Sequence, residues 1–278
     1  MSGFGLIASY PRSGNTWVRA VLTALVRGSG QLDINALEGP IASDRSFIDD
    51  ALEIETSDLL PHEERRLRPI AGRAAFVSDT HSFPIKTHDA WLPAAGAAEP
   101  PFPRELIDTV ILIVRDPRDV VVSFARYFGF TIDAAIGAMA HPGFSLGTSK
   151  TGLRPQVSQL VSSWSGHTAS WLGSGLPLTL IRYEDLVAAP SEGFAAIARV
   201  CGYATAPEAL AMAIDAARLD RLTTAEARTG FRESSPHAPN RFFGAGAPGG
   251  WRDTLTAPQA ARILGDHGAV MRELGYAE

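Results

Sequence analysis

The chain has 278 residues, of which 45% are hydrophobic and 20% are charged, a composition that excludes a disordered chain. The formal net charge of −5 excludes a global basic field of the kind that holds nucleic acid. The single cysteine, Cys201, excludes an internal disulfide and a multi-cysteine zinc site, and we interpret it as a small core residue at the end of a helix.

Apolar stretches are short throughout the chain. None approaches the roughly 20 residues that a membrane span needs. Residues 1–10 lack the basic region that precedes the apolar run of a signal peptide. We therefore expect a soluble, cytoplasmic protein with no membrane segment.

Four short apolar runs predict buried strands. Val110–Val114 is the strongest, because it is apolar and rich in β-branched residues, as a strand covered on both faces must be. The other three runs are residues 4–8, 83–86 and 178–181. Helical spacing and end signals predict helices from Thr16 to Gly28, after Pro117, and over 156–172, 191–200, 207–227 and 258–274.

Less regular segments separate these elements. The mixed-charge run at 63–68 is typical of a solvated helix face, and residues 240–251 form a glycine-rich tract. Strands that alternate with helices indicate an α/β fold with a central parallel sheet and helices on both faces. No repeat or long linker divides the chain, so we expect one domain over 1–278.

The segment between the first strand and the first helix carries the clearest chemical signal. Unpaired backbone N–H groups and the helix dipole make a helix N-terminus an anion site. Gly14 allows a close approach of the backbone, Arg12 adds a positive charge, and Ser13, Asn15 and Thr16 add short polar groups. On these grounds alone, phosphate binding is only modestly favoured over a polar turn with a capping residue.

The same segment does not have the features of a metal–nucleotide site. It lacks the Gly-Lys-Ser/Thr ending of a Walker A loop. Thr16 could hold magnesium, but no acidic partner is identifiable. The histidines outside the motif described below show no metal-ligand spacing. We therefore expect no metal in the mechanism.

Several motifs in register resemble those of sulfotransferases that use 3′-phosphoadenosine 5′-phosphosulfate (PAPS). Tyr10–Trp17 resembles the 5′-phosphosulfate loop, Ile85–His88 the Lys-Thr-His element, and Ile113–Ser123 the 3′-phosphate segment. Weaker matches follow at 182–186 and 249–252. The resemblance spans residues 7–256 and implies a three-layer α/β fold similar to that of P-loop kinases.

The resemblance also implies donor-binding roles. Arg12, where the family usually has lysine, would bind the phosphosulfate and offset charge on the leaving oxygen. Further donor contacts are implied for Ser13, Gly14, Asn15 and Thr16 at the 5′-phosphate, Arg115 and Ser123 at the 3′-phosphate, and Trp17 and Tyr183 at the adenine. From spacing alone, two alternatives remain open. Trp17 could pack in the core, and Arg115 could form a salt bridge with Asp116 or Asp119. For Arg118 we prefer such a salt bridge.

Lys86 and His88 are the implied catalytic pair, together with Arg12. Side chains two apart on an extended segment point to the same face, so both can reach one substrate. His88 would take the proton from the acceptor as general base, and Lys86 would stabilise charge on the transferring sulfuryl oxygens.

One departure from the family pattern concerns the glycine-rich tract. Family members usually carry an Arg-Lys-Gly step before the Gly-x-Trp turn, and its basic pair binds the 3′-phosphate. Alignment of Gly246 and Trp251 places Gly244 and Ala245 at that pair. Arg241 is the nearest base and our candidate replacement, whereas Arg252 lies on the far side of Trp251.

The predicted function is sulfuryl transfer from PAPS to a hydroxyl or amine of a small or mid-sized acceptor. A kinase or other phosphotransferase of the same layered fold and a non-catalytic nucleotide-binding protein are the alternatives. We expect the variable segments 31–75, 130–155 and 232–250 to set the acceptor, whose identity the sequence does not reveal. Phe242 and Phe243 are candidates for an apolar acceptor pocket or for the core. The oligomeric state is not readable either.

Overall fold

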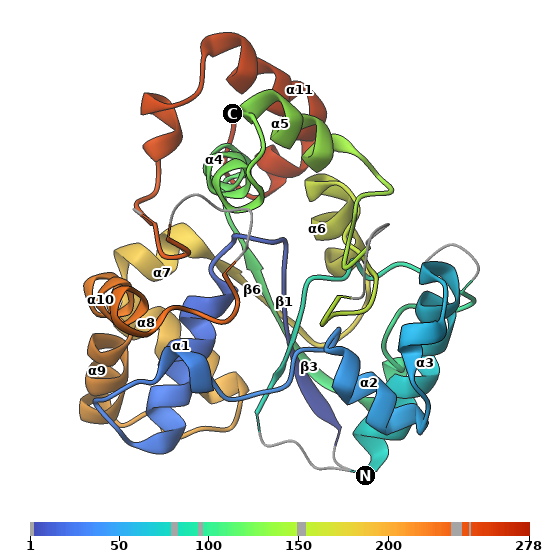
Figure 1. Ribbon diagram of the computed structural model, residues 1–278. Helices are drawn as coiled ribbons and strands as arrows, with labels where there is room; N and C mark the ends of the chain where they lie inside the picture. Colours follow the sequence, from blue (N-terminus) through green and yellow to red (C-terminus); the bar gives the residue numbers. More distant parts are fainter. Residues whose placement is uncertain (1–2, 79–82, 94–96, 149–153, 235–240, 245) are drawn as a thin grey trace. The chain divides into compact units, whose positions relative to one another are not determined.

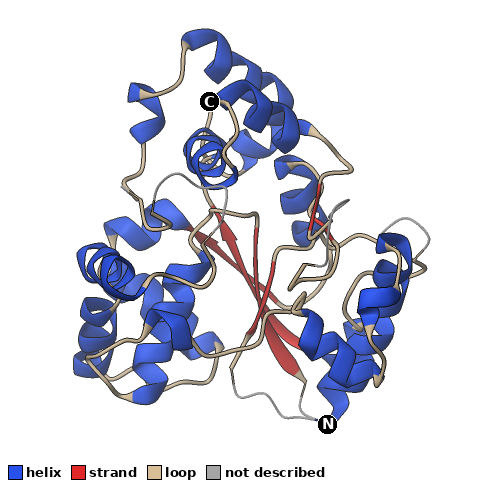
Figure 2. Cartoon of the chain, viewed as in Figure 1, coloured by secondary structure: helices blue, strands red, loops and turns tan. Residues whose placement is uncertain are grey.

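The computed structural model describes residues 3–78, 83–93, 97–148, 154–234, 241–244 and 246–278. The chain has an α/β fold with a four-stranded parallel sheet flanked by helices (Figures 1 and 2). Across the sheet the strands follow the order β2–β1–β3–β6. Because parallel neighbours need crossover connections rather than tight hairpins, this order agrees with the alternation expected from the sequence.

Each strand of the sheet contains residues of one predicted apolar run. The strands are β1 (Phe4–Ser9), β2 (Ile85–Thr87), β3 (Ile107–Val114) and β6 (Leu178–Arg182). β1 and the second half of β3 are almost entirely buried, which is why they read as continuous apolar runs. β1 pairs with β2 in the register Leu6 with Ile85, Ile7 with Lys86 and Ala8 with Thr87.

The chain divides into two compact units, each built from three segments. Unit 1 comprises Met1–Tyr10, Gly39–Leu112 and His141–Leu180. Unit 2 comprises Pro11–Glu38, Ile113–Ala140 and Ile181–Glu278. β3 and β6 each continue from one unit into the other.

Unit 1 holds most of the sheet and the helices of the central segments. Beside the sheet strands, its elements are α2 (Arg45–Leu52), η2 (Thr56–Asp58), α3 (Pro61–Ser78), η3 (Arg104–Leu106), β4 (Ser145–Leu146), β5 (Gln159–Leu160) and α6 (Trp164–Leu172). α2 and α3 pack against each other around a small core of Ile48, Ala71 and Val157. β4 and β5 form a short antiparallel pair.

Unit 2 is mainly helical. Its elements are α1 (Asn15–Arg27), η1 (Ile34–Ala36), α4 (Pro117–Phe128), α5 (Ile132–Ala140), α7 (Tyr183–Ala188), α8 (Pro190–Val200), α9 (Pro207–Ala216), α10 (Leu219–Thr229), η4 (Gly250–Asp253) and α11 (Ala257–Glu273). α1 packs against α8 and α9, and α4 packs against α5 and α11. Cys201 follows α8 as predicted, and burial raises the pKa of its thiol to about 12.

Two predicted helices are wrong in extent. The helix expected over 156–172 begins only at Trp164, and residues 159–160 form β5 instead. The cause is local: Ser162 has a φ of 66°, which no helix accommodates, and Ser163 caps α6 by accepting a hydrogen bond from the Gly166 N–H. The helix expected over 207–227 is two helices, because Arg218 is extended and starts α10 anew.

Candidate functional site

The ends of β1 and β2 bring Ser9 and His88 together in unit 1. The parallel register pairs Ala8 with Thr87, so the next residue of each strand lies at the same edge of the sheet. There the His88 Nδ1 lies 2.7 Å from the Ser9 carbonyl oxygen and 3.3 Å from Ser9 Oγ. The histidine is partly buried and its ring is held by the strand beside it.

This contact fixes the tautomer of His88. A carbonyl oxygen can only accept a hydrogen bond, so Nδ1 carries the proton and donates it to Ser9. In the neutral ring Nε2 is then the basic nitrogen. An imidazole oriented through Nδ1 in this way can take a proton at Nε2, as a general base must.

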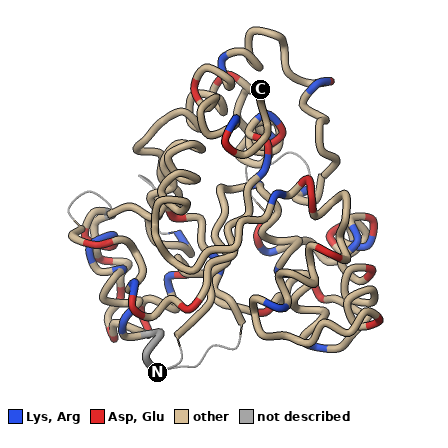
Figure 3. Tube along the Cα trace, turned by 180° about the vertical axis from the view of Figure 1, so that it is seen from behind, with Lys and Arg blue, Asp and Glu red and all other residues tan. Residues whose placement is uncertain are grey.

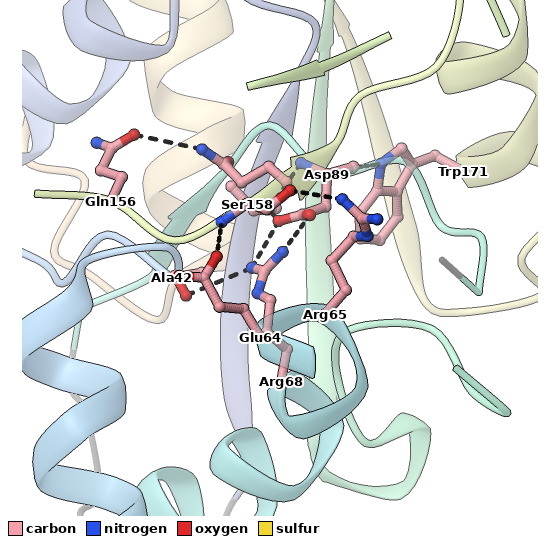
Figure 4. A network of polar contacts seen from close by, with 10 residues as sticks. Ala42, Glu64, Arg65, Arg68, Asp89, Gln156, Ser158 and Trp171 are labelled. Atoms are coloured by element: carbon pink, nitrogen blue, oxygen red, sulfur yellow. Dashed lines mark hydrogen bonds and ion pairs between the residues drawn. The ribbon is translucent and has the colours of Figure 1, made fainter. Parts of the chain in front are cut away.

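Asp89, which follows His88, anchors the base segment 85–91 to the rest of unit 1. Its carboxylate forms an ion pair with both terminal nitrogens of Arg68 on α3 and accepts a hydrogen bond from Thr87 Oγ1 at 2.9 Å (Figure 4). Its carbonyl accepts from Trp171 Nε1 at 2.9 Å. Both partners of the ion pair are at most 4% exposed. The segment that carries His88 is therefore held from α3 and α6 at once.

The charged run at 63–68 is only in part a solvated face: Arg66 is exposed, but two other charged residues of the run are buried, contrary to our expectation. Glu64 is 6% exposed and pairs with Arg45 at 2.7 Å, and Arg68 is 4% exposed. Glu64 Oε2 also accepts from the Ser158 N–H, and Arg65 donates to Ser158 Oγ. Figure 3 shows acidic and basic residues close together in several parts of the trace. The order of charges within the run does not itself mark which of them are buried.

Loop 11–16 and the start of α1 form the first part of the site in unit 2. Gly14 is the N-cap of α1 with a φ of 108°, and no side chain caps this end. The first turn contains no acidic residue, so the positive end of the helix dipole is not offset there. Ser13 Oγ is buried and has no hydrogen-bond partner among the described residues. A Cβ at Gly14 would strike the Tyr183 ring, which explains the glycine.

Arg12 lies in the left-handed region with a φ of 71° and reaches across unit 2 to α4 and the glycine-rich tract. Its Nε donates to Ser123 Oγ at 3.0 Å and its Nη2 to the Phe242 carbonyl at 2.8 Å. The guanidinium lies over the rings of Phe242 and Tyr127, 4.2 and 4.8 Å from their centroids. Burial is the main cause that lowers the pKa of Arg12 to about 10.

Arg115, at the end of β3, lies next to this loop. Its Nη1 donates to the Arg12 carbonyl at 3.2 Å, and its guanidinium lies 4.4 Å from the centroid of the Tyr183 ring. Arg115 Nε is buried and has no hydrogen-bond partner within the described part of the chain. No described carboxylate forms an ion pair with Arg115, whereas Arg118 pairs with Asp116 at 2.7 Å, as we preferred for Arg118.

The two aromatic residues expected at the adenine also meet in unit 2. Trp17 packs edge-to-face against Tyr183 and Phe194, with ring centroids 5.9 and 5.0 Å apart. Tyr183 is buried and its hydroxyl donates to the Gly246 carbonyl at 2.8 Å. The Trp17 ring thus has core neighbours, and core packing describes its contacts in this structure.

Carboxylates hold the described parts of the glycine-rich tract. Glu226 on α10 accepts hydrogen bonds from the N–H groups of Phe242 and Phe243. Asp119 on α4 accepts from the N–H groups of Gly249 and Trp251, at 2.7 and 2.9 Å. Both side chains are less than 9% exposed. The aromatic rings of Phe231, Phe242 and Phe243 pack on one another beside Glu226.

Arg241 lies apart from these contacts. It is exposed and lines a groove of about 820 Å³ along α10, together with residues of that helix such as Arg218 and Asp220. It forms no hydrogen bond or ion pair with another residue that the structure describes. Its assignment to the 3′-phosphate remains a prediction.

In a comparison with known families, the model of the sulfotransferase domain matches residues 5–275. The chain belongs to the sulfotransferase domain family. Sulfotransferase 1A1 of Rattus norvegicus is 24% identical over 282 residues, which cover 98% of this chain and 85% of that protein. The corresponding protein of Canis lupus familiaris is also 24% identical, over 97% of this chain and 84% of its own.

Solved structures share the fold of this sulfotransferase. Retinol dehydratase in complex with androsterone and the inactive cofactor PAP superimposes with a TM-score of 0.60, at 18% identity over 96% of this chain and 80% of the other. Mouse sulfotransferase SULT7A1 complexed with PAP gives a TM-score of 0.58, at 17% identity over 98% and 84% of the two chains.

The structure distributes the expected sulfotransferase residues over the two units. Lys86 and His88 belong to unit 1, and the donor-binding candidates from Arg12 to Trp17, with Arg115, Ser123, Tyr183 and Arg241, belong to unit 2. The sequence interpretation missed Arg68, Asp89 and Glu226. Asp89 directly follows the Lys-Thr-His element, a position that could have drawn attention to it, whereas nothing local marks Arg68 or Glu226.

Among the residues that the structure describes, no group of three or more His, Cys, Asp or Glu side chains could hold a metal ion. No single described helix has the length and hydropathy of a membrane span, although α4 and α5 meet these criteria as a pair bent by 113°.

Proposed function

We propose that this sulfotransferase transfers a sulfuryl group from PAPS to a hydroxyl or amine of a small or mid-sized acceptor. The observation that carries the proposal is the contact of His88 Nδ1 with the Ser9 carbonyl, because it leaves Nε2 as the basic nitrogen. Ser9 ends β1, and Arg12 follows three residues later in the chain. The Ser9 carbonyl that orients the base and the anion-binding loop thus belong to one continuous stretch of the chain.

The residues of unit 2 suit a donor that carries phosphate groups. Ser13 Oγ and Arg115 Nε are buried donors with no hydrogen-bond partner among the described residues, and the uncapped N-terminus of α1 adds backbone N–H groups. Anions are stabilised where such groups and arginines converge. Bound there, PAPS supplies an activated sulfuryl group with adenosine 3′,5′-bisphosphate (PAP) as the leaving group.

The chain's own residues then move a proton and balance charge. His88 Nε2 takes the proton from the acceptor while the acceptor oxygen or nitrogen forms a bond to sulfur and the bond from sulfur to the bridging phosphate oxygen breaks. Lys86 stabilises the sulfuryl oxygens, and Arg12 offsets the charge on the phosphate. Protonated His88 later returns its proton to solvent.

The acceptor is a small molecule in this proposal. Retinol dehydratase has been solved with retinol and with androsterone, and both are apolar molecules that carry a hydroxyl group. We extend only the chemical class to this chain. Phe242 and Phe243 pack against Phe231, and these rings form an aromatic cluster in unit 2.

Calorimetric titration with PAP in the absence of magnesium tests the donor, with ATP as the competing ligand. We expect metal-independent binding of PAP that weakens sharply in Arg115→Ala and stays unchanged in Arg199→Ala, an exposed arginine of α8. In a second experiment, phenols, sterols and amines are screened as acceptors with PAPS, and the release of PAP is measured. Preference for ATP with magnesium would favour a phosphotransferase, and PAP binding without turnover of any acceptor class would favour a nucleotide-binding protein.

A further inference from the structure

Arg126 on α4 is an arginine that no motif assigns to the site. It lies three residues after Ser123, and residues at this spacing share one face of a helix. Ser123 accepts the hydrogen bond of Arg12 Nε. The backbone of α4 therefore places Arg126 one turn beyond a residue already in contact with the donor loop.

The guanidinium of Arg126 packs directly on the glycine-rich tract. A Cβ built on Gly244 would coincide with it. Gly244 does not have a positive φ, so its backbone would accept a side chain, and the three atoms nearest to the added Cβ all belong to the guanidinium. The absence of a side chain at residue 244 is thus what lets Arg126 occupy this place.

Positive charge accumulates at this point of unit 2. The pKa of Arg12 is lowered mainly by burial and further by the charges of Arg126 and Arg115, so both of these arginines lie near enough for their charge to act on Arg12. No ion pair joins any of the three to a carboxylate within the described residues. Glu226 lies near enough to raise the pKa of Arg12, but its two oxygens accept from the N–H groups of Phe242 and Phe243.

We propose that Arg126 binds the second phosphate group of the nucleotide donor, the one on the ribose, and supplies there the positive charge that residue 244 does not carry. The inference rests on the proposed function, because it needs a donor with two separate phosphate groups. A guanidinium can hold a phosphate through two parallel hydrogen bonds, and a second nearby arginine favours such an anion further. Arg115 and Ser123 complete the contacts.

This assignment differs from the one that sequence spacing suggests. Arg241 is nearer to Gly244 in the chain, but it is exposed and lines the groove along α10. Arg126 is far from Gly244 in the chain and packs on it in space. Contact with Gly244 in the folded chain therefore favours Arg126.

The test compares the affinities for PAP and for adenosine 5′-phosphate, which lacks the ribose phosphate. In Arg126→Gln we expect the affinity for PAP to fall about 10- to 100-fold, as for the loss of a charge-assisted contact, while that for adenosine 5′-phosphate changes less than about threefold. Arg126→Lys should recover part of the loss. Arg262→Gln, an exposed arginine of α11, is the matched control and should bind both ligands as the unaltered protein does.

Gly244→Ala provides an independent variant, because the added methyl group would displace the Arg126 guanidinium. It should lower the affinity for PAP on its own and add little in the Arg126→Gln background. Such non-additivity is the signature of two residues that act through one contact. Circular dichroism and denaturant unfolding of each variant show whether the fold is retained.

Three results would overturn the inference while leaving the proposed function standing. They are unchanged PAP affinity in Arg126→Gln, equal losses for the two nucleotides in a folded variant, and a selective loss of PAP affinity in Arg241→Gln alone. If the unaltered protein does not bind PAP, the proposed function fails, and this inference fails with it.

Discussion

The base segment 85–91 and the arginine cluster, which consists of Arg12, Arg115 and Arg126, differ in whether nearby carboxylates compensate the charges of their arginines. Around the base segment, buried arginines are paired with buried carboxylates: Arg68 with Asp89, and Arg45 with Glu64. Within the arginine cluster, no guanidinium is paired with a described carboxylate, and Glu226 is engaged by backbone N–H groups. The buried arginines around the base segment are compensated by carboxylates, whereas the arginine cluster has a surplus of positive charge.

This difference separates two physical tasks. A general base works from a fixed position, and a closed network of ion pairs and hydrogen bonds supplies that position. An anion-binding site needs charge and hydrogen-bond donors that are not consumed by the protein itself. A variant in one region should therefore impair either the general base or anion binding and leave the other function intact.

The largest effect is expected from His88→Ala. Loss of the general base should lower turnover of PAPS with an acceptor by about 10²- to 10⁴-fold, while PAP affinity stays nearly unchanged because the donor contacts lie elsewhere. Turnover and calorimetric titration are measured on the same preparation. His62→Ala, an exposed histidine of α3, is the control. Full turnover in His88→Ala would remove His88 from the mechanism.

The charge pairing of the base segment is tested by Arg68→Met. Without its cation the Asp89 carboxylate is buried and uncompensated, so we expect the free energy of unfolding to fall by about 3–5 kcal/mol. Arg73→Met on the same helix is the matched control, because Arg73 is 43% exposed and pairs with exposed Glu99. There the loss should stay within about 1 kcal/mol. Urea unfolding measures both, and equal losses would contradict the proposed importance of burial.

A smaller effect is expected from Glu226→Ala in unit 2. The N–H groups of Phe242 and Phe243 lose their acceptor, which should lower the free energy of unfolding by about 1–3 kcal/mol. Glu273→Ala, an exposed carboxylate of α11, should change it by less than about 0.5 kcal/mol. If the two variants unfold alike, the carboxylate does not hold the tract.

The smallest effect, counted per pH unit, is a pH dependence of the free energy of unfolding that arises in unit 1. His167 is fully buried with its ring edge-on to Tyr10, and burial lowers its pKa to about 3. Below the unfolded-state pKa of about 6.5 the unfolded chain binds a proton that the folded chain does not. The free energy of unfolding should therefore decrease from pH 6.5 toward pH 3, by at most about 1.4 kcal/mol per pH unit for this group.

Unfolding curves between pH 7 and pH 4 measure this dependence. In His167→Phe the decrease should be less steep, and in His141→Asn, an exposed histidine, it should be unchanged. His267, whose pKa burial lowers to about 4, adds a similar slope that both variants retain. An unaltered slope in His167→Phe would show that this histidine is protonated in the folded state.

The strands and the donor loop were predictable because their signals are local. An apolar run such as Val110–Val114 needs cover on both faces wherever it lies, and a glycine before a helix, such as Gly14, marks a backbone conformation. The Lys-Thr-His element was equally readable, since its residues are neighbours in the chain. Local chemistry of this kind survives in a sequence with only 24% identity to curated relatives.

The charge pairing was not predictable, because it depends on tertiary partners. Nothing within α3 distinguishes Arg68, which is buried against Asp89, from exposed Arg66 two positions before it. Likewise, the space at Gly244 is filled by Arg126, which lies more than a hundred residues earlier. The turn at Ser162 was not predicted, because this residue has a left-handed backbone conformation but is not a glycine.

The division of the chain into interleaved segments has a consequence for its synthesis. The last segment of unit 1 ends at Leu180, whereas unit 2 needs residues up to Glu278. A ribosome synthesises the chain from its N-terminus. All ion-pair partners of the base segment are therefore synthesised before Glu226, which lies near the arginine cluster. Nascent chains stalled shortly after residue 220 should therefore already protect Trp171 from solvent while the glycine-rich tract has yet to be made.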